Sequence, residues 1–252
     1  MKYSIIIPAK NEENRIVSTL TDLCLYLHSK NLKDRFEIIV VVNNSTDGTL
    51  EITKDLSKDF SEINYVNAPF YTGKGGAVAI GFQVARAGIV GFVDADGSSS
   101  PAEVYNVFKA LAEDKSVDGV IADRYMKGSI IDGSQSKLRV LFGTMYRSLA
   151  GLLFKVEYTD TQCGLKAFRK QAAKNFAENI STIGWTFDLN LLLLAKYFGY
   201  KVKSVPTVWN DVAGSQLRIL PTIFSVSKEF ILLKLVDSSV SLQQIFKVFL
   251  KR

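Results

Sequence analysis

The sequence IVGFVDADG, at residues 89–97, joins an uninterrupted apolar run to two carboxylates, Asp94 and Asp96. The run predicts a strand buried on both faces of a sheet, because a strand with one solvated face alternates apolar and polar residues. Residues 3–12 and 36–48 repeat this order, with polar residues directly after an apolar run. Ligands of open α/β sheets bind beyond the carboxyl ends of the strands, so these polar residues are expected to converge on one crevice.

Helical patterns separate the apolar runs along the chain. Strands and helices in alternation are typical of a doubly wound α/β fold, with a mainly parallel sheet and helices on both faces. A loop is predicted at 125–137, where glycine and serine gather. Strands are predicted at Tyr3–Ile7, Phe36–Val42, Ile63–Val66, Ile89–Val93 and Val117–Ala122 and near 200–207. Helices are predicted near 12–30, 47–60, 75–87, 101–114, 137–154 and 186–199, and two more within 219–252.

The composition fits one globular domain with a short appendage. Of the 252 residues 47% are hydrophobic, which suffices for one substantial core. The two cysteines, Cys24 and Cys163, match no metal-ligand spacing, and the single histidine, His28, excludes a multi-histidine metal site. This cysteine usage indicates a reduced, cytoplasmic compartment. No secretory signal is visible, and no apolar stretch reaches the roughly 18 residues that a membrane-spanning helix needs.

The net charge of +6 is unevenly distributed. Residues 1–125 contain 13 Lys and Arg against 17 Asp and Glu, a net of −4, whereas residues 126–252 contain 18 against 8, a net of +10. The second half is therefore predicted to meet an anionic partner or surface, although a solvated basic face has the same composition.

The carboxylates of Asp94 and Asp96 are candidate metal ligands. Hard oxygen ligands suit Mg²⁺ or Mn²⁺, and these ions also bind diphosphate oxygens. The alternative is that one carboxylate caps the following helix while the other is solvated. The run Gly73-Lys74-Gly75-Gly76 opens a predicted helix, where backbone amides attract anions, or it forms a plain turn. It is not a P-loop, because the G-x-x-x-x-G-K-[ST] pattern is absent.

Further motifs follow in order: GKGGA at 73–77, DTQCGLK at 160–166 and WTFD at 185–188, with VW at 208–209 and GS at 214–215. The whole set resembles the family-two glycosyltransferases of the GT-A fold. Within them it is most similar to the dolichyl-phosphate glucosyltransferases and their polyprenyl-phosphate relatives. The resemblance spans residues 3–216, so it implies a GT-A domain over 1–216 and a helical appendage over 217–252, either a membrane-surface or an oligomer contact.

The resemblance also implies roles for individual residues. The catalytic set would be Asp96, Arg124, Arg139 and Asp188, with the two arginines at the acceptor phosphate and Asp188 at the acceptor side. Asp94 and Asp96 would hold the metal. Contacts to the nucleotide sugar are implied for Pro8, Ala9, Asn11, Glu12, Asn43, Lys74, Asp94, Ala95, Asp96, Asp160 and Gln162.

Three positions depart from the family pattern. Val42 and Asn43 stand where relatives usually carry acidic residues after the second strand, which leaves the nucleobase open. Ser98 stands where the mannosyl relatives often carry a metal-side glutamine. Asn190 replaces a common acidic residue, so Asp188 alone would supply a carboxylate there.

The resemblance implies inverting transfer of a hexose, with glucose and a UDP-sugar favoured, to dolichyl or polyprenyl phosphate, for lipid-linked sugars and protein glycosylation. A dianionic phosphate oxygen would attack the anomeric carbon without a general base. The expected location is peripheral, at the cytoplasmic face of a membrane. Nucleic acid is not an expected partner, and a homo-oligomer stays possible.

Other functions remain open from the sequence. A GDP-mannose-dependent dolichyl-phosphate mannosyltransferase would use the same motifs. Transfer to a glycan hydroxyl would need a general base, for which Asp188 is the candidate. Nucleotidyl transfer would want a glycine-rich loop after the first strand, which 8–12 lacks. A non-catalytic nucleotide-sugar binding module could keep the carboxylate pair.

Overall fold

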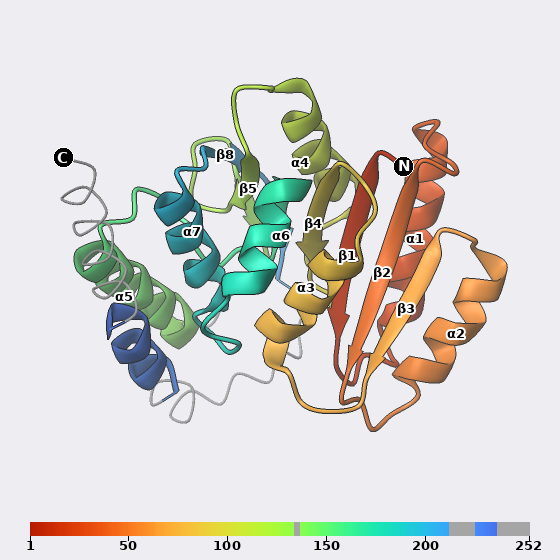
Figure 1. Cartoon of the computed structure of the whole chain (residues 1–252), viewed down its shortest axis with the longest axis horizontal. Coiled ribbons are helices and arrows are strands. Elements are labelled where there is room, and N and C mark those ends of the chain that lie inside the picture. Colours follow the sequence, from red (N-terminus) through yellow and green to blue (C-terminus); the bar gives the residue numbers. More distant parts are fainter. Residues whose placement is uncertain (134–136, 212–224, 236–252) are drawn as a thin grey trace, which may run out of the picture.

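The computed structural model describes residues 1–133, 137–211 and 225–235. Its main sheet has seven strands in the order β3-β2-β1-β4-β7-β5-β8, flanked by helices on both faces (Figure 1). The strands of this sheet are β1 (Tyr3–Ala9), β2 (Phe36–Asn43), β3 (Ile63–Ala68), β4 (Ile89–Val93), β5 (Gly119–Asp123), β7 (Leu165–Arg169) and β8 (Val202–Pro206). The helices are α1 (Ile16–Ser29), α2 (Thr49–Asp59), α3 (Gly73–Val84), α4 (Pro101–Glu113), α5 (Lys137–Phe154), α6 (Lys170–Asn179) and α7 (Phe187–Phe198).

Two apolar clusters form the core, one on each face of the sheet. Successive residues of β1 point to opposite faces of the sheet. Ile5 and Ile7 pack in the cluster formed with α1 and α4, and Ile6 packs in the cluster formed with α3, α6 and α7. β2 divides in the same way, with Ile38 on one face and Ile39 on the other. Burial on both faces explains the continuous apolar runs, and it confirms the predicted mainly parallel α/β fold.

The sheet contains one strand that the sequence pattern did not reveal. β7 runs antiparallel between β4 and β5, so it separates the parallel strands at the centre. The lysine at its second position, Lys166, interrupts the apolar run, although its side chain is fully buried. The prediction of a loop over 125–137 was also wrong in part, because β6 (Ile130–Asp132) pairs with β9 (Val208–Asn210) in a second, two-stranded sheet.

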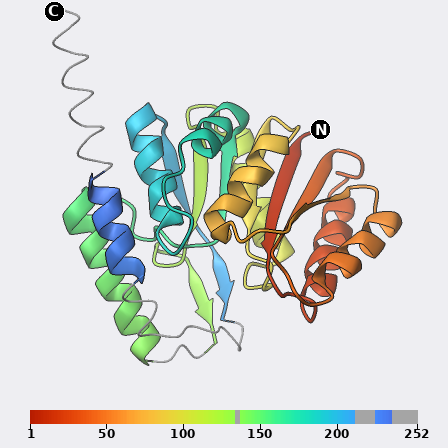
Figure 2. The ribbon, with the colours of Figure 1, turned by 60° about the horizontal axis from the view of Figure 1, so that its bottom comes forward.

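Helix α5 and the helical residues 225–235 lie side by side at one end of the main sheet (Figures 1 and 2). Tyr146 and Phe154 of α5 pack against Phe230, with ring centroids 5.0 and 5.8 Å apart. Of the expected appendage over 217–252, the structure describes only residues 225–235. The predicted domain boundary at residue 216 also lies outside the described part of the chain. Among the helices that the structure describes, none has the length and apolar character to cross a membrane.

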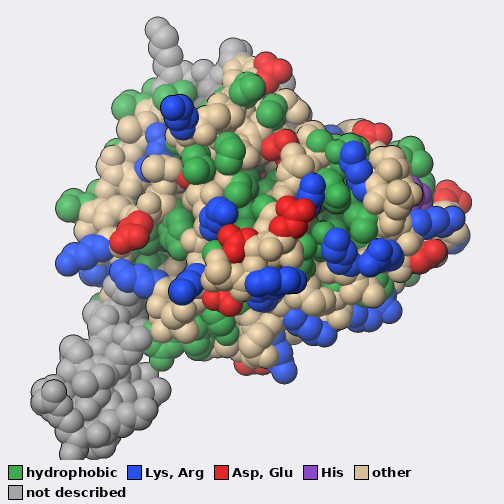
Figure 3. Space-filling model, turned by 90° about the horizontal axis from the view of Figure 1, so that it is seen from above, with side chains coloured by type: hydrophobic (Ala, Val, Ile, Leu, Met, Phe, Trp, Pro, Cys, Tyr) green, Lys and Arg blue, Asp and Glu red, His purple; other side chains and the backbone are tan. Residues whose placement is uncertain are grey.

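The polar loops expected to bind a ligand follow the carboxyl ends of β1, β2 and β4. The opposite side of the molecule, seen in Figure 3, carries Lys and Arg side chains interspersed with Asp and Glu.

Candidate functional site

The polar residues after β1 and β2 are bound to one another. Asn11, in the left-handed region at φ 56°, accepts a hydrogen bond through Oδ1 from the Thr46 amide at 2.9 Å. The Glu12 amide donates to Thr49 Oγ1 at 2.8 Å. The preceding residues, Pro8 and Ala9, still pair with Val41 and Val42 in the ladder of β1 and β2. The loops that follow β1 and β2 are therefore held together by hydrogen bonds at the carboxyl ends of these strands.

Glu12 also belongs to the electrostatic environment of the carboxylate pair. Burial raises the pKa of Glu12, and the negative charges of Asp96 and Asp94 raise it further, while its ion pair with Arg15 opposes the change. The Arg15 guanidinium lies 2.7 Å from Glu12 Oε2. The acidic side chains of Glu12, Asp94 and Asp96, from the loops after β1 and β4, are thus close enough to influence one another.

A chain of opposite charges connects Asp94 to helix α7. Lys74 Nζ lies 2.6 Å from Asp94 Oδ1 and 3.6 Å from Asp188 Oδ2. Burial lowers the pKa of Lys74, but the carboxylates of Asp188 and Asp94 outweigh this effect and the net shift is upward. Burial likewise raises the pKa of Asp94, assisted by Asp96 and opposed by Lys74. The Gly-Lys turn therefore places a permanent cation beside the carboxylate pair.

The loop after β4 fixes Asp96. Its Oδ1 accepts from the Ser98 amide at 3.0 Å and from Ser98 Oγ at 2.6 Å, so Ser98 orients the carboxylate. The carbonyl of the buried Ala95 accepts from Thr19 Oγ1 at 3.0 Å. Gly164 lies against the other carboxylate, since a Cβ there would meet Asp94 Oδ2 at 1.9 Å.

The described residues contain no group of three or more His, Cys, Asp or Glu side chains placed to hold a metal ion. Asp94 and Asp96 alone nevertheless fit a hard cation that takes its remaining oxygens from a ligand, as Mg²⁺ does with one or two carboxylates and substrate phosphates. The half-buried Asp96 carboxylate uses only Oδ1 in its bonds to Ser98, which leaves Oδ2 for such an ion. The donor set therefore suits a cation that binds together with a diphosphate.

Asn43 holds the turn that carries Lys74. Its Nδ2 donates to the Gly73 carbonyl at 3.0 Å, and its Oδ1 accepts from both the amide and Oγ1 of Thr72 at 3.0 Å. Gly73 has a φ of 65°, in the left-handed region, which glycine adopts at little cost because it has no Cβ. The structure thus gives Asn43 a positioning contact, whereas its predicted contact to a nucleoside stays a prediction.

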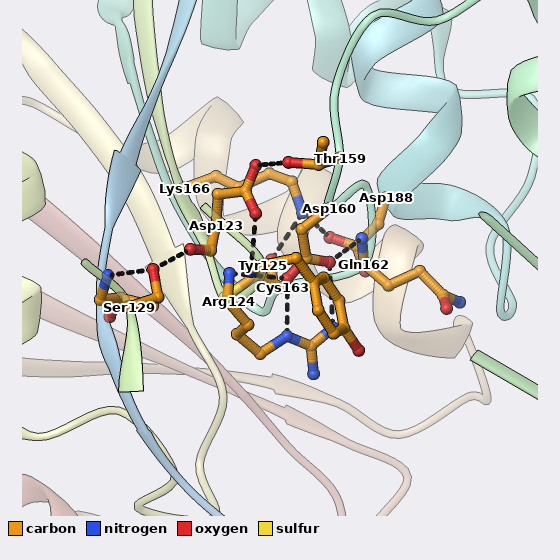
Figure 4. Close-up of polar contacts among 11 residues, drawn as sticks. Asp123, Arg124, Tyr125, Ser129, Thr159, Asp160, Gln162, Cys163, Lys166 and Asp188 are labelled. Atoms are coloured by element: carbon orange, nitrogen blue, oxygen red, sulfur yellow. Dashed lines mark hydrogen bonds and ion pairs between the residues drawn. The ribbon is translucent and has the colours of Figure 1, made fainter. Parts of the chain in front are cut away.

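Arg124 and Asp160 form a buried fork (Figure 4). Arg124 Nε and Nη2 lie 2.6 and 3.0 Å from the two oxygens of Asp160, and the Arg124 amide donates to Asp160 at 3.1 Å. Burial raises the pKa of Asp160, but the bonds and charge of Arg124 outweigh it and the net shift is downward. The backbone amide of Gln162 donates a hydrogen bond to Asp160 Oδ1 at 3.1 Å, and the Gln162 side chain points away from the fork.

Two residues that sequence reasoning missed complete this region. Lys166, fully buried, donates to the Cys163 carbonyl at 2.6 Å and to Asp188 Oδ1. Glu229 accepts through Oε2 from the amide and Oγ1 of Thr186 at 2.9 and 2.8 Å, two residues before Asp188. A lysine between Leu165 and Ala167 in β7 was a signal for the first. No local pattern marks the second, because 43 residues separate Glu229 from Thr186.

Two further arginines, Arg147 and Arg139, belong to helix α5. Arg147 of α5 stacks on the Tyr125 ring, with its guanidinium carbon 3.8 Å from the ring centroid, and the Arg124 guanidinium lies 5.7 Å from the same ring. Arg139 also belongs to α5, but its side chain lies outside the described part of the structure. The structure thus brings Asp94, Asp96, Lys74 and Asp188 into one site, with Arg124 and Asp160 in a fork beside Trp209.

Known proteins resemble this chain in sequence and in fold. The model of the family "Glycosyl transferase family 2" matches residues 4–176. The dolichyl-phosphate beta-glucosyltransferase ALG5D of Trichomonas vaginalis is 31% identical over 222 residues, covering 86% of this chain and 68% of its own. The dolichyl-phosphate beta-glucosyltransferase of Saccharomyces cerevisiae is 28% identical and covers 92% of this chain and 74% of its own.

A solved structure shares the fold. Glucosyl-3-phosphoglycerate synthase from Mycobacterium tuberculosis, crystallised with Mn²⁺, uridine diphosphate and phosphoglyceric acid, superposes with a TM-score of 0.68. It covers 94% of this chain and 78% of its own length at 21% identity. At that identity the likeness establishes the architecture alone.

Proposed function

This chain belongs to glycosyl transferase family 2, and from that premise we propose that it transfers glucose from a UDP-sugar to dolichyl phosphate or a related polyprenyl phosphate. It is a glycosyltransferase with the GT-A fold. The relatives named dolichyl-phosphate beta-glucosyltransferase, which match most of the chain, support glucose and the lipid phosphate as its substrates.

One observation carries the choice of acceptor: both oxygens of Asp188 face ammonium groups. Lys166 bonds to Oδ1, and Lys74 lies 3.6 Å from Oδ2. Asp188 is 5% exposed and already holds these two ion pairs, so it is poorly placed to take a proton from an incoming hydroxyl. A phosphate oxygen is already ionised at neutral pH and needs no base. The arrangement therefore favours a phosphate acceptor over a glycan hydroxyl.

The donor's diphosphate is proposed to lie between the carboxylate pair and Lys74. Asp94 and Asp96 would hold Mg²⁺ or Mn²⁺, which when bound neutralises charge on the leaving diphosphate. Lys74, already 2.6 Å from Asp94, would contact the diphosphate oxygens directly. Fixed charges in these positions stabilise a leaving group without reorganising during the reaction.

The acceptor phosphate is proposed to meet arginine side chains. Arg124 uses Nε and Nη2 for Asp160, and its remaining Nη1 is the group proposed for a phosphate oxygen. Arg147, stacked on the Tyr125 ring beside it, would supply a second guanidinium. Guanidinium groups suit this task because their planar fork matches phosphate geometry. Arg139 stays a candidate for the same role.

The decisive experiment incubates UDP- and GDP-sugars with polyprenyl phosphate and Mg²⁺ or Mn²⁺, and measures lipid-linked sugar. Asp96→Asn should lower turnover with UDP-glucose by roughly 100-fold or more, because it removes charge that the diphosphate site requires. Asp55→Asn is the matched control, since Asp55 is an exposed carboxylate of α2 paired with Lys58 at 2.7 Å. Wild-type turnover in the Asp96 variant would contradict the proposed metal role, and transfer only from GDP-mannose would contradict the proposed donor.

We further propose that α5 and residues 225–235 rest on the cytoplasmic face of a membrane. Their outer faces expose large apolar side chains, with Leu141 62%, Leu152 77% and Ile231 65% accessible. Interfacial helices bind lipid through such a face. Leu141→Glu and Leu152→Glu should reduce flotation with anionic liposomes, whereas Val17→Glu, on exposed apolar surface of α1, should not. Flotation that is equal in all variants would refute the proposed surface.

A further inference from the structure

Two aromatic side chains stand exposed at the ligand-binding edge of the sheet. Phe70 is 80% and Tyr71 60% accessible, in the loop that joins β3 to α3. This loop leads directly into Gly73 and Lys74, so it follows a strand at the same edge as the carboxylate pair. Large exposed aromatics at such an edge suggest a ligand with a flat apolar face.

The Tyr71 ring reaches across the end of a neighbouring strand. Lys10 Nζ, just after β1, lies 4.4 Å from the centroid of this ring. β3 and β1 are not adjacent, because β2 lies between them. Since neighbouring strands are about 4.8 Å apart, the contact spans the carboxyl end of β2. Tyr71 and Lys10 therefore bracket the position of Asn43, the last residue of β2.

Asn43 itself is largely committed to the fold. Both acceptor positions of Oδ1 are taken by Thr72, and one amide hydrogen binds the Gly73 carbonyl. A side-chain amide has two such acceptor positions, so its carbonyl is saturated. The hydrogen bonds of Asn43 consequently hold the loop that carries Tyr71. Another side chain must therefore provide the main contact to a nucleobase.

We propose that the Tyr71 ring stacks on the nucleobase of the donor, with Lys10 beside it. The inference rests on the proposed function, because it supplies the nucleobase subsite for the same nucleotide. The loop joins this subsite to the diphosphate site, since only two residues separate Tyr71 from Lys74. Stacking on an aromatic face tolerates different bases, so Tyr71 would add affinity for the nucleoside.

Calorimetric titration with UDP and with inorganic pyrophosphate, each with Mn²⁺, tests the proposal. Tyr71→Ala should weaken UDP binding by about 5- to 100-fold, the range of one base–aromatic stack, and leave pyrophosphate binding unchanged. Tyr71→Phe should bind UDP like the wild type, because it keeps the ring. Phe70→Ala is the matched control, an exposed aromatic of the same loop without the Lys10 contact, and should bind nearly as well as the wild type.

The outcomes separate the two proposals. If Tyr71→Ala binds UDP with wild-type affinity, or loses affinity for UDP and pyrophosphate equally, either result overturns the stacking role. The proposed function would still stand in that case, provided that the wild-type protein binds UDP. A stronger effect of Phe70→Ala than of Tyr71→Ala would also overturn it. A wild-type protein that bound pyrophosphate but neither UDP nor GDP would refute the proposed function and the inference together.

Discussion

Replacement of Lys166 by methionine tests whether the buried charge chain holds the site together. Methionine keeps much of the length of the side chain but has no ammonium group. The change removes the bond to Asp188 Oδ1 and the 2.6 Å bond to the Cys163 carbonyl. Lys166 is 0% and Asp188 5% exposed, so water cannot replace the lost partner without a local rearrangement.

The expected cost follows from this burial. Removing one partner of a buried ion pair costs about 3–5 kcal/mol, because the other charge stays uncompensated. Lys74, 3.6 Å from Asp188 Oδ2, retains part of the compensation. We therefore expect the free energy of unfolding to fall by about 3 kcal/mol. At about 2–4 °C per kcal/mol for a chain of this size, the Tm should fall by about 6–12 °C.

Urea and thermal unfolding followed by circular dichroism measure this change. Lys54→Met is the matched control, since its 2.7 Å pair with Glu51 is exposed on α2 and should contribute little to stability. The double variant Lys166→Met/Asp188→Asn should be more stable than Lys166→Met alone, because it leaves no unpaired carboxylate. A Lys166→Met protein within about 1 kcal/mol of the wild type would refute the reasoning.

Three further predictions concern acid stability, the metal and the carboxylate pair. Burial raises the pKa of Glu37, but the hydrogen bonds and ion pair with Ser4 and Arg86 outweigh burial and lower this pKa overall. Glu37 therefore stabilises the fold above the pKa of an unfolded glutamate, about 4.3, and this stabilisation is lost as the pH falls below that value. Glu37→Gln should therefore be less stable than the wild type at pH 7, with the difference shrinking toward pH 3; a constant difference in urea unfolding would contradict this. EDTA should abolish transfer and Mn²⁺ should restore it, with the far-ultraviolet circular dichroism unchanged; turnover that persists after dialysis against EDTA would argue against a metal. Gly164→Ala should lower turnover at least 10-fold, as its Cβ would displace Asp94; crystals of an active variant with Asp94 unmoved would exclude that explanation.

The sequence predicted the parts of the fold that depend on local pattern. Apolar runs such as 38–42 are recognisable because each residue is buried on one face of the sheet or the other. The positions of Asp94 and Asp96 followed from the same pattern, since residues directly after parallel strands meet at one edge. The opening of a helix at Gly73 and Lys74 belongs to this group too.

Only the tertiary structure decided which charges compensate one another. β7 escaped prediction because Lys166 reads as a polar interruption until Asp188, 22 residues later, is seen to neutralise it. The contact of Glu229 with Thr186 joins residues 43 apart in the sequence. The side-chain hydrogen bonds of Asn43 go to Thr72 and Gly73, which are 29 and 30 residues away. Burial of an apolar side chain is favourable with any apolar neighbour, so pattern suffices to predict it. Burial of a charge or an amide is tolerated only with specific partners, and the fold alone determines where those partners lie.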